Sequence, residues 1–452
     1  MAASTMTIRG ERVVTPDGTR PAAVHLRDGT IVAVTDPDAR PTGEVVDAGP
    51  LVVAPGLVDV HVHVNEPGRT AWEGFATATR AAAAGGVTAL LDMPLNSVPS
   101  TVTADALATK RAAAEGRCHV DVGFWGGIVP GNTDDLADLH AAGVFGFKAF
   151  LADPGVEEFR HVAPAQLEQA MRRLADLDAL TIVHAEDDEV LARAAGVLDE
   201  GDPRAYATWL ASRPDEAEVR AVETVGGLAL TTGARAHVLH LSSADALAPL
   251  HRAARAGARL TAETCPHYLT LTAEGVPDGA TAFKCAPPIR DARNRDRLWT
   301  ALADGTLTLV ASDHSPTTPE RKLLDAGDVV RAWGGIASLQ LGLAAMWTHA
   351  SPRGHIPADV VHWMSTAPAR LAGLDRKGAL APGHDADVVA WDPDQAWEVD
   401  GAALEHRHPV TPYHGARLRG RVVTTWVRGQ MVYDRGTVTG PPRGRLLRRE
   451  QR

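Results

Sequence analysis

The chain has 452 residues, of which 45% are hydrophobic and 22% are charged, an ordinary composition for a globular protein with one large domain and a smaller one. Its formal net charge of −11 argues against a protein that binds nucleic acid. Three cysteines are too few for a disulfide framework, and neither a membrane-spanning run nor a signal-peptide pattern is present, so we expect a cytoplasmic enzyme, with a structural or binding protein left open by composition alone.

Residues 1–53 are predicted to form short antiparallel strands. Two of these strands, residues 23–26 and 30–34, flank Asp28 and Gly29, a pair typical of a tight hairpin turn. We interpret this segment as the first part of a small β domain that precedes the main body of the chain.

Residues 54–377 change to apolar strands that alternate with alanine-rich helices. This pattern predicts a parallel (β/α)₈ barrel of the TIM type, so the expected fold class is α/β. The expected strands cover residues 57–64, 87–93, 120–128, 144–151, 180–184, 236–241, 259–264 and 307–312, and helices are expected at 72–84, 164–175, 216–229 and 336–348.

Residues 378–440 return to short strands, at 386–391, 422–427 and 430–433. The simplest arrangement pairs them with the N-terminal strands in one small β-sandwich domain, into which the barrel is inserted. Residues 441–452 are locally basic, and we expect them to form a solvated tail.

The first barrel strand ends in His61 and His63. Because side chains alternate along a strand, both imidazoles project to the same side and could chelate one divalent cation. The alternative is a pair of histidines packed in the core.

Other polar side chains fall at the ends of later strands, and barrel chemistry is found at these carboxyl ends. Either later histidine alone could be a core residue, and the aspartate could be a helix N-cap. A lysine within an apolar strand is costly unless it is paired or modified. These residues are Lys148, His184, His240 and Asp313, and together with the first pair they predict a metal site.

Imidazole and carboxylate ligands suit Zn²⁺, with Mn²⁺, Co²⁺ or Fe²⁺ possible. Four histidines and one aspartate exceed the three protein ligands of one open catalytic zinc, so two metals fit better. Two close dications need a bridging anion. Reaction of the Lys148 amine with CO₂ would supply one as a carbamate, an N6-carboxylysine.

The order of these residues resembles the binuclear pattern of the amidohydrolase superfamily, and within it the cyclic amidases, over nearly the whole chain. The resemblance implies that His61, His63 and Asp313 hold one metal and that His184 and His240 hold the other. It further implies a bridging hydroxide as nucleophile beside carbamylated Lys148, Asp313 as the catalytic proton carrier, and a homotetramer.

The loops resemble those of one group of cyclic amidases, the allantoinases. Asn65 stands where dihydroorotases carry an arginine for the substrate carboxylate, and the similar segments are residues 65–70, 72–74, 93–96, 285–290 and 332–336. The resemblance implies hydrolysis of allantoin to allantoate in purine degradation. The rival interpretations are a hydantoinase or dihydropyrimidinase with the same machinery, and a non-catalytic scaffold relative, which would need no intact ligand set.

Allantoin is uncharged, so we expect its recognition to depend on amide-matching donors and acceptors. Asn96 could instead be only a turn residue, and the glycine pair only a flexible loop. Arg69 and Arg290 are expected to brace loops. The candidate substrate contacts are Asn65, Asn96, Cys285, Gly334 and Gly335.

Overall fold

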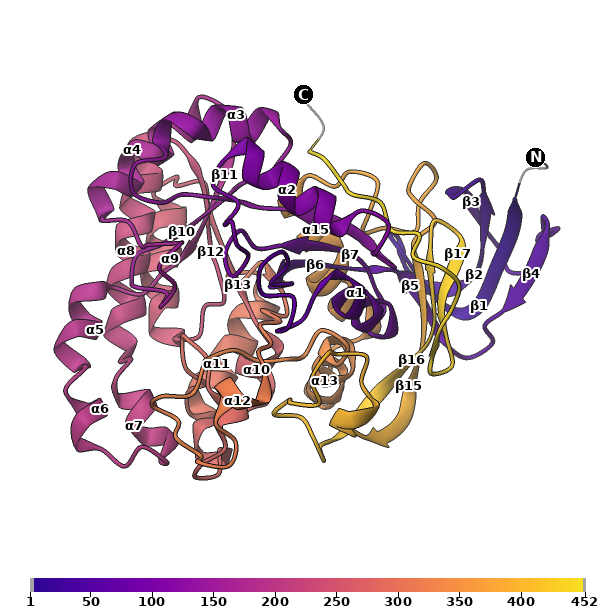
Figure 1. Ribbon diagram of the computed structural model, residues 1–452. Helices are drawn as coiled ribbons and strands as arrows, with labels where there is room; N and C mark the ends of the chain where they lie inside the picture. Colours follow the sequence, from indigo (N-terminus) through magenta and orange to yellow (C-terminus); the bar gives the residue numbers. More distant parts are fainter. Residues whose placement is uncertain (1–3, 450–452) are drawn as a thin grey trace.

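The computed structural model describes residues 4–449 and shows a barrel with a sheet beside it (Figure 1). Residues 1–3 and 450–452, which belong to the predicted N-terminal unit and the predicted basic tail, lie outside the described residues. Within the described range, no helix is both long and apolar enough to cross a membrane.

The barrel has eight strand positions, in agreement with the prediction. Three strands form one hydrogen-bonded sheet and six form another, and β8 and β9 share one position because only Trp125 separates them. The barrel closes where Val62 pairs with His314 and the His63 N–H donates to the His314 carbonyl at 2.8 Å. The strands are β6 (Leu57–Val62), β7 (Val87–Asp92), β8 (Asp121–Phe124), β9 (Gly126–Gly127), β10 (Phe147–Phe150), β11 (Leu180–His184), β12 (Arg235–Val238), β13 (Leu260–Thr264) and β14 (Leu309–Val310).

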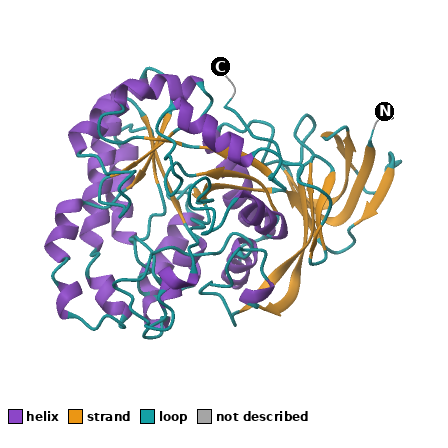
Figure 2. Cartoon of the chain, viewed as in Figure 1, coloured by secondary structure: helices purple, strands orange, loops and turns teal. Residues whose placement is uncertain are grey.

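Helices cover the outside of the barrel (Figure 2). In α4 the buried residues are Leu167, Ala170, Met171 and Leu174, whose helical spacing puts them on one face toward the strands. The helices are α1 (Phe75–Ala84), α2 (Ala104–Ala114), α3 (Leu136–Ala141), α4 (Pro164–Ala175), α5 (Asp188–Ala194), α6 (Val197–Glu200), α7 (Tyr206–Ala211), α8 (Asp215–Thr232), α9 (Leu247–Arg255), α10 (Pro266–Thr270), α11 (Ala292–Ala303), α12 (Pro319–Lys322), α13 (Gly342–Ala350), α14 (Pro357–Val361) and α15 (Ala367–Ala372).

Strands from both chain ends form one nine-stranded sheet, so the prediction that the two ends build one β domain is confirmed. The N-terminal and C-terminal halves meet where β5 pairs antiparallel with β15. The strands are β1 (Thr5–Thr15), β2 (Gly18–Arg27), β3 (Thr30–Thr35), β4 (Glu44–Asp47), β5 (Val52–Pro55), β15 (Val388–Glu398), β16 (Arg417–Val427), β17 (Gln430–Asp434) and β18 (Thr437–Val438).

A buried lysine joins the barrel to this sheet. Lys377 Nζ donates to Asp121 on β8 at 2.9 Å, to Asp387 next to β15 at 2.6 Å, and to Asp385 at 3.2 Å. Arg428 also contacts Asp121. The three carboxylates could hold a metal ion by their spacing, but the ammonium already lies among them, and we therefore interpret the cluster as a structural connection.

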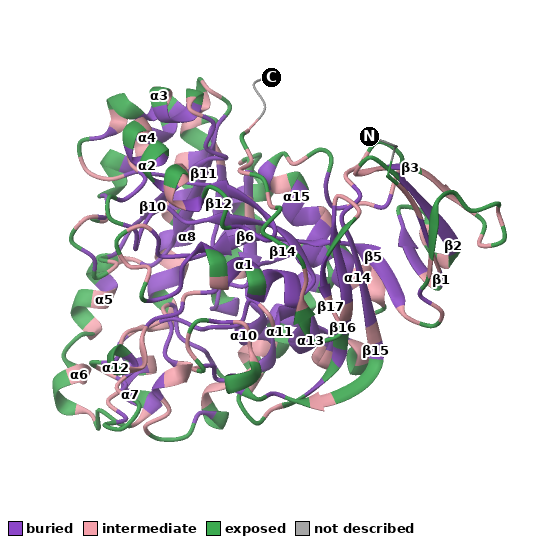
Figure 3. Cartoon of the chain, turned by 45° about the vertical axis from the view of Figure 1, so that its right-hand side comes forward, coloured by how far each residue is buried: buried purple, intermediate pink, exposed green. Residues whose placement is uncertain are grey.

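The last described residues pack on the barrel. The Gly444 N–H donates to the Cys118 carbonyl and the Leu447 N–H to the Val122 carbonyl, both at 2.8 Å. Part of the predicted tail thus pairs its backbone with a barrel segment, while residues 441–449 are all exposed or half-buried. Figure 3 shows how burial concentrates along the barrel strands, with exposed residues on the outer faces of the helices.

Candidate metal centre

The predicted ligands meet at the carboxyl end of the barrel, where they border a cavity of about 290 Å³. His61 lies behind this group, with its ring centroid 5.5 Å from that of His63 and 5.3 Å from that of His240. All of the predicted ligands are buried. Those that line the cavity are His63, Lys148, His184, His240 and Asp313.

One half of the centre contains His61, His63 and Asp313, whose nitrogen and oxygen atoms lie close enough to share a metal ion. Asp313 Oδ1 is 3.2 Å from His61 Nε2 and 3.4 Å from His63 Nε2. His61 Nδ1 is 2.6 Å from Glu263 Oε1. A proton on Nδ1 donated to this carboxylate leaves Nε2 with a free lone pair that faces Asp313, which is the arrangement a metal ligand needs.

The other half contains His184 and His240. His184 Nδ1 is 2.9 Å from His240 Nε2, and His184 Nε2 is 2.7 Å from Glu186 Oε2. Glu186 is in turn paired with Arg213. The carboxylate therefore orients the His184 ring with Nδ1 toward the second histidine.

Lys148 lies on β10, and its Nζ is 4.6 Å from the centroid of the Phe150 ring. Burial lowers the pKa of Lys148 to about 8, so the neutral amine that reacts with CO₂ is accessible near neutral pH. Within residues 4–449 we find no hydrogen bond or ion pair from this amine to a carboxylate.

The donor set fits divalent metal ions. Burial would raise the pKa of Asp313, but His61 and His63 together lower it well below its usual range, so the carboxyl is ionised. Burial lowers the pKa of His63 to about 4, so that imidazole is neutral. The described residues offer His61 Nε2 no hydrogen-bond partner, and a metal at this place would satisfy it.

The backbone is strained at several of these positions. His240 has φ of 36° and Asp313 has φ of 43°, while Asn65 and Asn96 have φ of 66° and 61°. Left-handed conformations are uncommon for residues other than glycine and cluster at functional sites, although asparagine adopts them more readily. At His240, Asp313 and Asn96 this backbone carries a side chain that lines the cavity, at a cost in local stability.

Four of the five predicted substrate contacts line the cavity, and one does not. Asn96, Cys285, Gly334 and Gly335 line the cavity. Asn65 does not line it, and its Nδ2 donates to the Pro316 carbonyl at 3.2 Å.

Part of the cavity wall is tied together by its own backbone groups. The Gly335 N–H donates to the Lys284 carbonyl at 2.8 Å, and Trp209 Nε1 donates to the Cys285 carbonyl at 2.9 Å. These two donors and two carbonyls already have partners within the wall, so a ligand would bind to other polar groups of the cavity.

Several residues of the site were not predicted. Glu263 and Glu186, which orient the histidines, lie in or directly after apolar strands. Since a buried charge in such a strand drew attention to Lys148, the same signal could have identified Glu263. Other residues of the cavity wall that were not predicted include Trp209, Arg213 and Lys284.

Comparisons with known proteins agree with this geometry. The profile of the amidohydrolase family matches residues 52–432. An allantoinase of Streptomyces avermitilis is 54% identical over 98% of this chain and 99% of its own length, and one of Arabidopsis thaliana is 43% identical over 95% and 88%. The structure of the L-hydantoinase (dihydropyrimidinase) of Arthrobacter aurescens superposes with a TM-score of 0.93, at 30% identity over 98% of this chain and 99% of that one.

Proposed function

The chain belongs to the amidohydrolase family, and from that premise we propose that it is an allantoinase, a hydrolase that opens the cyclic amide of allantoin to give allantoate. The observation that carries the substrate is the 54% identity to an allantoinase over nearly the full length of both chains. The buried histidines and Asp313 at the cavity would supply the chemistry that this activity needs.

The proposal includes two divalent ions, most simply Zn²⁺, per chain. His61, His63 and Asp313 would hold one ion, His184 and His240 the other, and carbamylated Lys148 would bridge them. When bound, the ions would supply a water molecule activated for attack and would polarise the scissile carbonyl.

Asp313 is the proposed proton carrier. Its carboxylate is ionised, lines the cavity and lies beside the two histidines of the first ligand set. It would accept the proton of the attacking water and deliver it to the leaving nitrogen of the opened ring, as general acid–base catalysis requires.

Recognition of the uncharged substrate would depend on hydrogen bonds. Asn96 lines the cavity, and its buried Oδ1 has no partner within the described chain. This oxygen could accept an N–H of the ring or of the ureido arm. The backbones of Cys285, Gly334 and Gly335 lie on the same cavity and complete the proposed direct contacts. Asn65, which does not line the cavity, would act through its bond to the Pro316 carbonyl, since Pro316 lies in the cavity wall.

A hydantoinase or dihydropyrimidinase is the second candidate, favoured by the TM-score of 0.93 to such an enzyme. The full ligand set speaks against a non-catalytic scaffold. Assembly into a homotetramer and a cytoplasmic location are further parts of the proposal. A relative from Aquarana catesbeiana carries the name mitochondrial allantoinase, so fractionation of the source cells would test the location.

Comparison of kcat/KM for allantoin, hydantoin, dihydrouracil and dihydroorotate on metal-supplied protein tests the substrate. Dihydroorotate should be poor because Asn65 provides no charge partner for its carboxylate, a loss of about 1.5–3 kcal/mol, or roughly tenfold or more in specificity. Allantoin should have the highest kcat/KM of the four because its ureido arm adds hydrogen bonds. If hydantoin or dihydrouracil were the better substrate, the hydantoinase interpretation would replace this one.

A further inference from the structure

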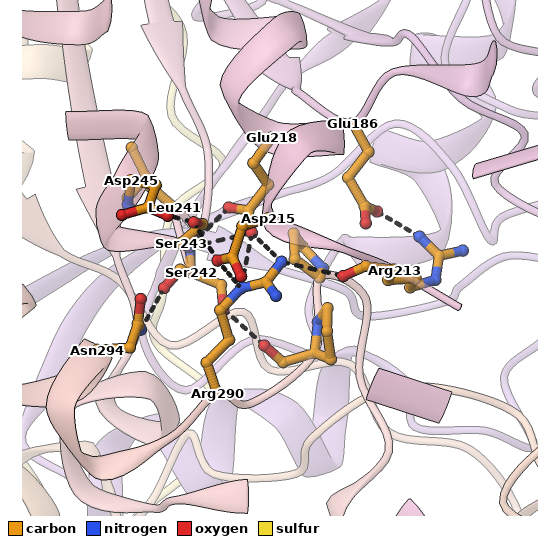
Figure 4. A network of polar contacts seen from close by, with 12 residues as sticks. Glu186, Arg213, Asp215, Glu218, Leu241, Ser242, Ser243, Asp245, Arg290 and Asn294 are labelled. Carbon is orange, nitrogen blue, oxygen red and sulfur yellow. Dashed lines mark hydrogen bonds and ion pairs between the residues drawn. The ribbon is translucent and has the colours of Figure 1, made fainter. Parts of the chain in front are cut away.

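Figure 4 shows a network of buried charged side chains, and one member, Glu186, contacts His184 of the metal centre. The network also comes from the turn between α7 and α8, from α8 itself, and from the segment around Arg290. Glu186, Glu218 and Arg290 are all at least nine-tenths buried, and Arg213 is largely covered. Buried charges of this kind are retained only where they are paired, so their partners indicate what they hold in place.

The first arm of the network acts on a histidine ring. Glu186 accepts from His184 Nε2 at 2.7 Å and is held from the other side by Arg213. Arg213 also lies over Trp209, with its guanidinium carbon 4.9 Å from the ring centroid. The arginine thus fixes the carboxylate that fixes the imidazole.

The second arm acts on the backbone that follows His240. Glu218 accepts the Ser242 N–H at 2.8 Å and the Ser243 N–H at 3.0 Å. Because His240 has a left-handed backbone, the direction of its side chain depends on how this turn is held. Glu218 therefore constrains the second histidine through the main chain.

Arg290 joins the two arms. Its Nη2 donates to Glu218 Oε1 at 2.8 Å and to the Arg213 carbonyl at 3.2 Å, and its Nε lies 3.1 Å from Asp215. His61 has a separate support, since Glu263 contacts it and is backed by His237 at 3.2 Å. Glu263 Oε1 also accepts the His240 N–H, but at 3.4 Å, so its short bond is to His61 in the first half, whereas Glu186 and Glu218 brace the second half.

We propose that Glu186, Arg213, Glu218 and Arg290 are positioning residues that act as one unit to set the metal affinity of the His184–His240 half, while Glu263 serves the His61–His63 half. This inference rests on the proposed binuclear centre. Loss of a partner that orients a metal ligand typically lowers metal affinity 10–100-fold. The effect should be confined to one of the two ions.

The test is a zinc titration of the full-length protein by equilibrium dialysis, with zinc bound per chain as the readout. Arg213→Met and Glu218→Gln should each lower the zinc affinity of the His184–His240 half 10–100-fold and leave the affinity of the His61–His63 half unchanged. Arg213→Lys should recover part of the lost affinity. Glu223→Gln is the matched control, because Glu223 is on the same helix and pairs with exposed Arg252 at 2.7 Å. That variant should bind both ions normally.

A second comparison assigns the effect to one half. In a His184→Ala background, the zinc affinity of the remaining site should not change with Arg213→Met but should fall with Glu263→Gln. Equal weakening of both ions, or none, would overturn the inference. Circular dichroism checks that each variant folds. If Glu218→Gln does not fold, the test depends on Arg213→Met, because Arg213 lies on a partly exposed turn. The titration uses no substrate, and a failed allantoin assay on the unaltered protein would count against the proposed function alone.

Discussion

Lys148 is the residue whose environment is hardest to explain without a modification. It is about 1% exposed within an apolar strand, and its Nζ lies over the face of Phe150, 4.6 Å from the ring centroid. A charged ammonium is costly there. A carbamate on the same nitrogen would become an anionic ligand between two cations, which turns an unfavourable group into a favourable one.

Replacement of Lys148 by Ala should therefore remove bound zinc and reduce turnover to near background. A small carboxylic acid added with zinc should restore part of both, because it can occupy the place of the carbamate. Metal content and turnover measured with and without the acid check this prediction. Near-normal turnover of Lys148→Ala would show that the lysine is structural.

Lys284 is a second buried lysine on the cavity, with a different task. Its Nζ donates to the Val330 and Ala332 carbonyls, both at 2.7 Å, and lies 4.1 Å from the centroid of Trp209. The Gly335 N–H also donates to the Lys284 carbonyl. Together these contacts hold the wall segment that carries the glycine pair.

Replacement of Lys284 by Met should let this wall shift and lower kcat/KM for allantoin roughly ten- to hundredfold, since small misplacements of binding groups are costly. The bound metal should stay unchanged, and added carboxylic acid should give no rescue, in contrast to Lys148→Ala. Lys284→Arg should recover part of the activity. Unchanged kcat/KM in Lys284→Met would show that this wall segment does not contribute to substrate recognition.

At the scale of elements, the strongest patterns were predicted to the residue. The strand at residues 180–184 and the helix at 164–175 have the bounds that their apolar spacing indicated. The helix expected from residue 336 begins instead at Gly342. The reason is tertiary, because the Ser338 and Leu339 N–H groups donate to His314 Nδ1. Periodicity along one segment carries no information about such a distant partner.

The contact between barrel and sheet was also beyond prediction, since it depends on Lys377 meeting carboxylates from distant segments. Replacement of Lys377 by Met should destabilise the protein by about 3–5 kcal/mol, because it leaves buried carboxylates without their cation. Urea unfolding followed by circular dichroism measures this. The control is Arg12→Met, which removes an exposed pair with Asp394 and should cost about 1 kcal/mol or less. Similar losses in the two variants would contradict a structural role for the cluster.

At the scale of the whole molecule, the architecture followed from alternating patterns. The barrel, its insertion into a β domain and the convergence of strand ends were all predicted from the chain. The residues that brace the ligands were not. Glu218 acts on the Ser242 N–H, which only the fold brings near it, and Glu186, although two residues from His184, gave no signal of this pairing in the strand pattern. Sequence spacing indicates which side chains share a strand end, whereas hydrogen-bond partners depend on packing between elements.

The most direct test of a binuclear allantoinase is a zinc titration of metal-free protein in which allantoin turnover is followed against zinc bound per chain. If the centre is binuclear, turnover should reach its maximum only as bound zinc approaches two per chain. His184→Ala protein should stop near one zinc and stay almost inactive. Full turnover with one zinc or none, or no turnover of allantoin with two, would contradict the account.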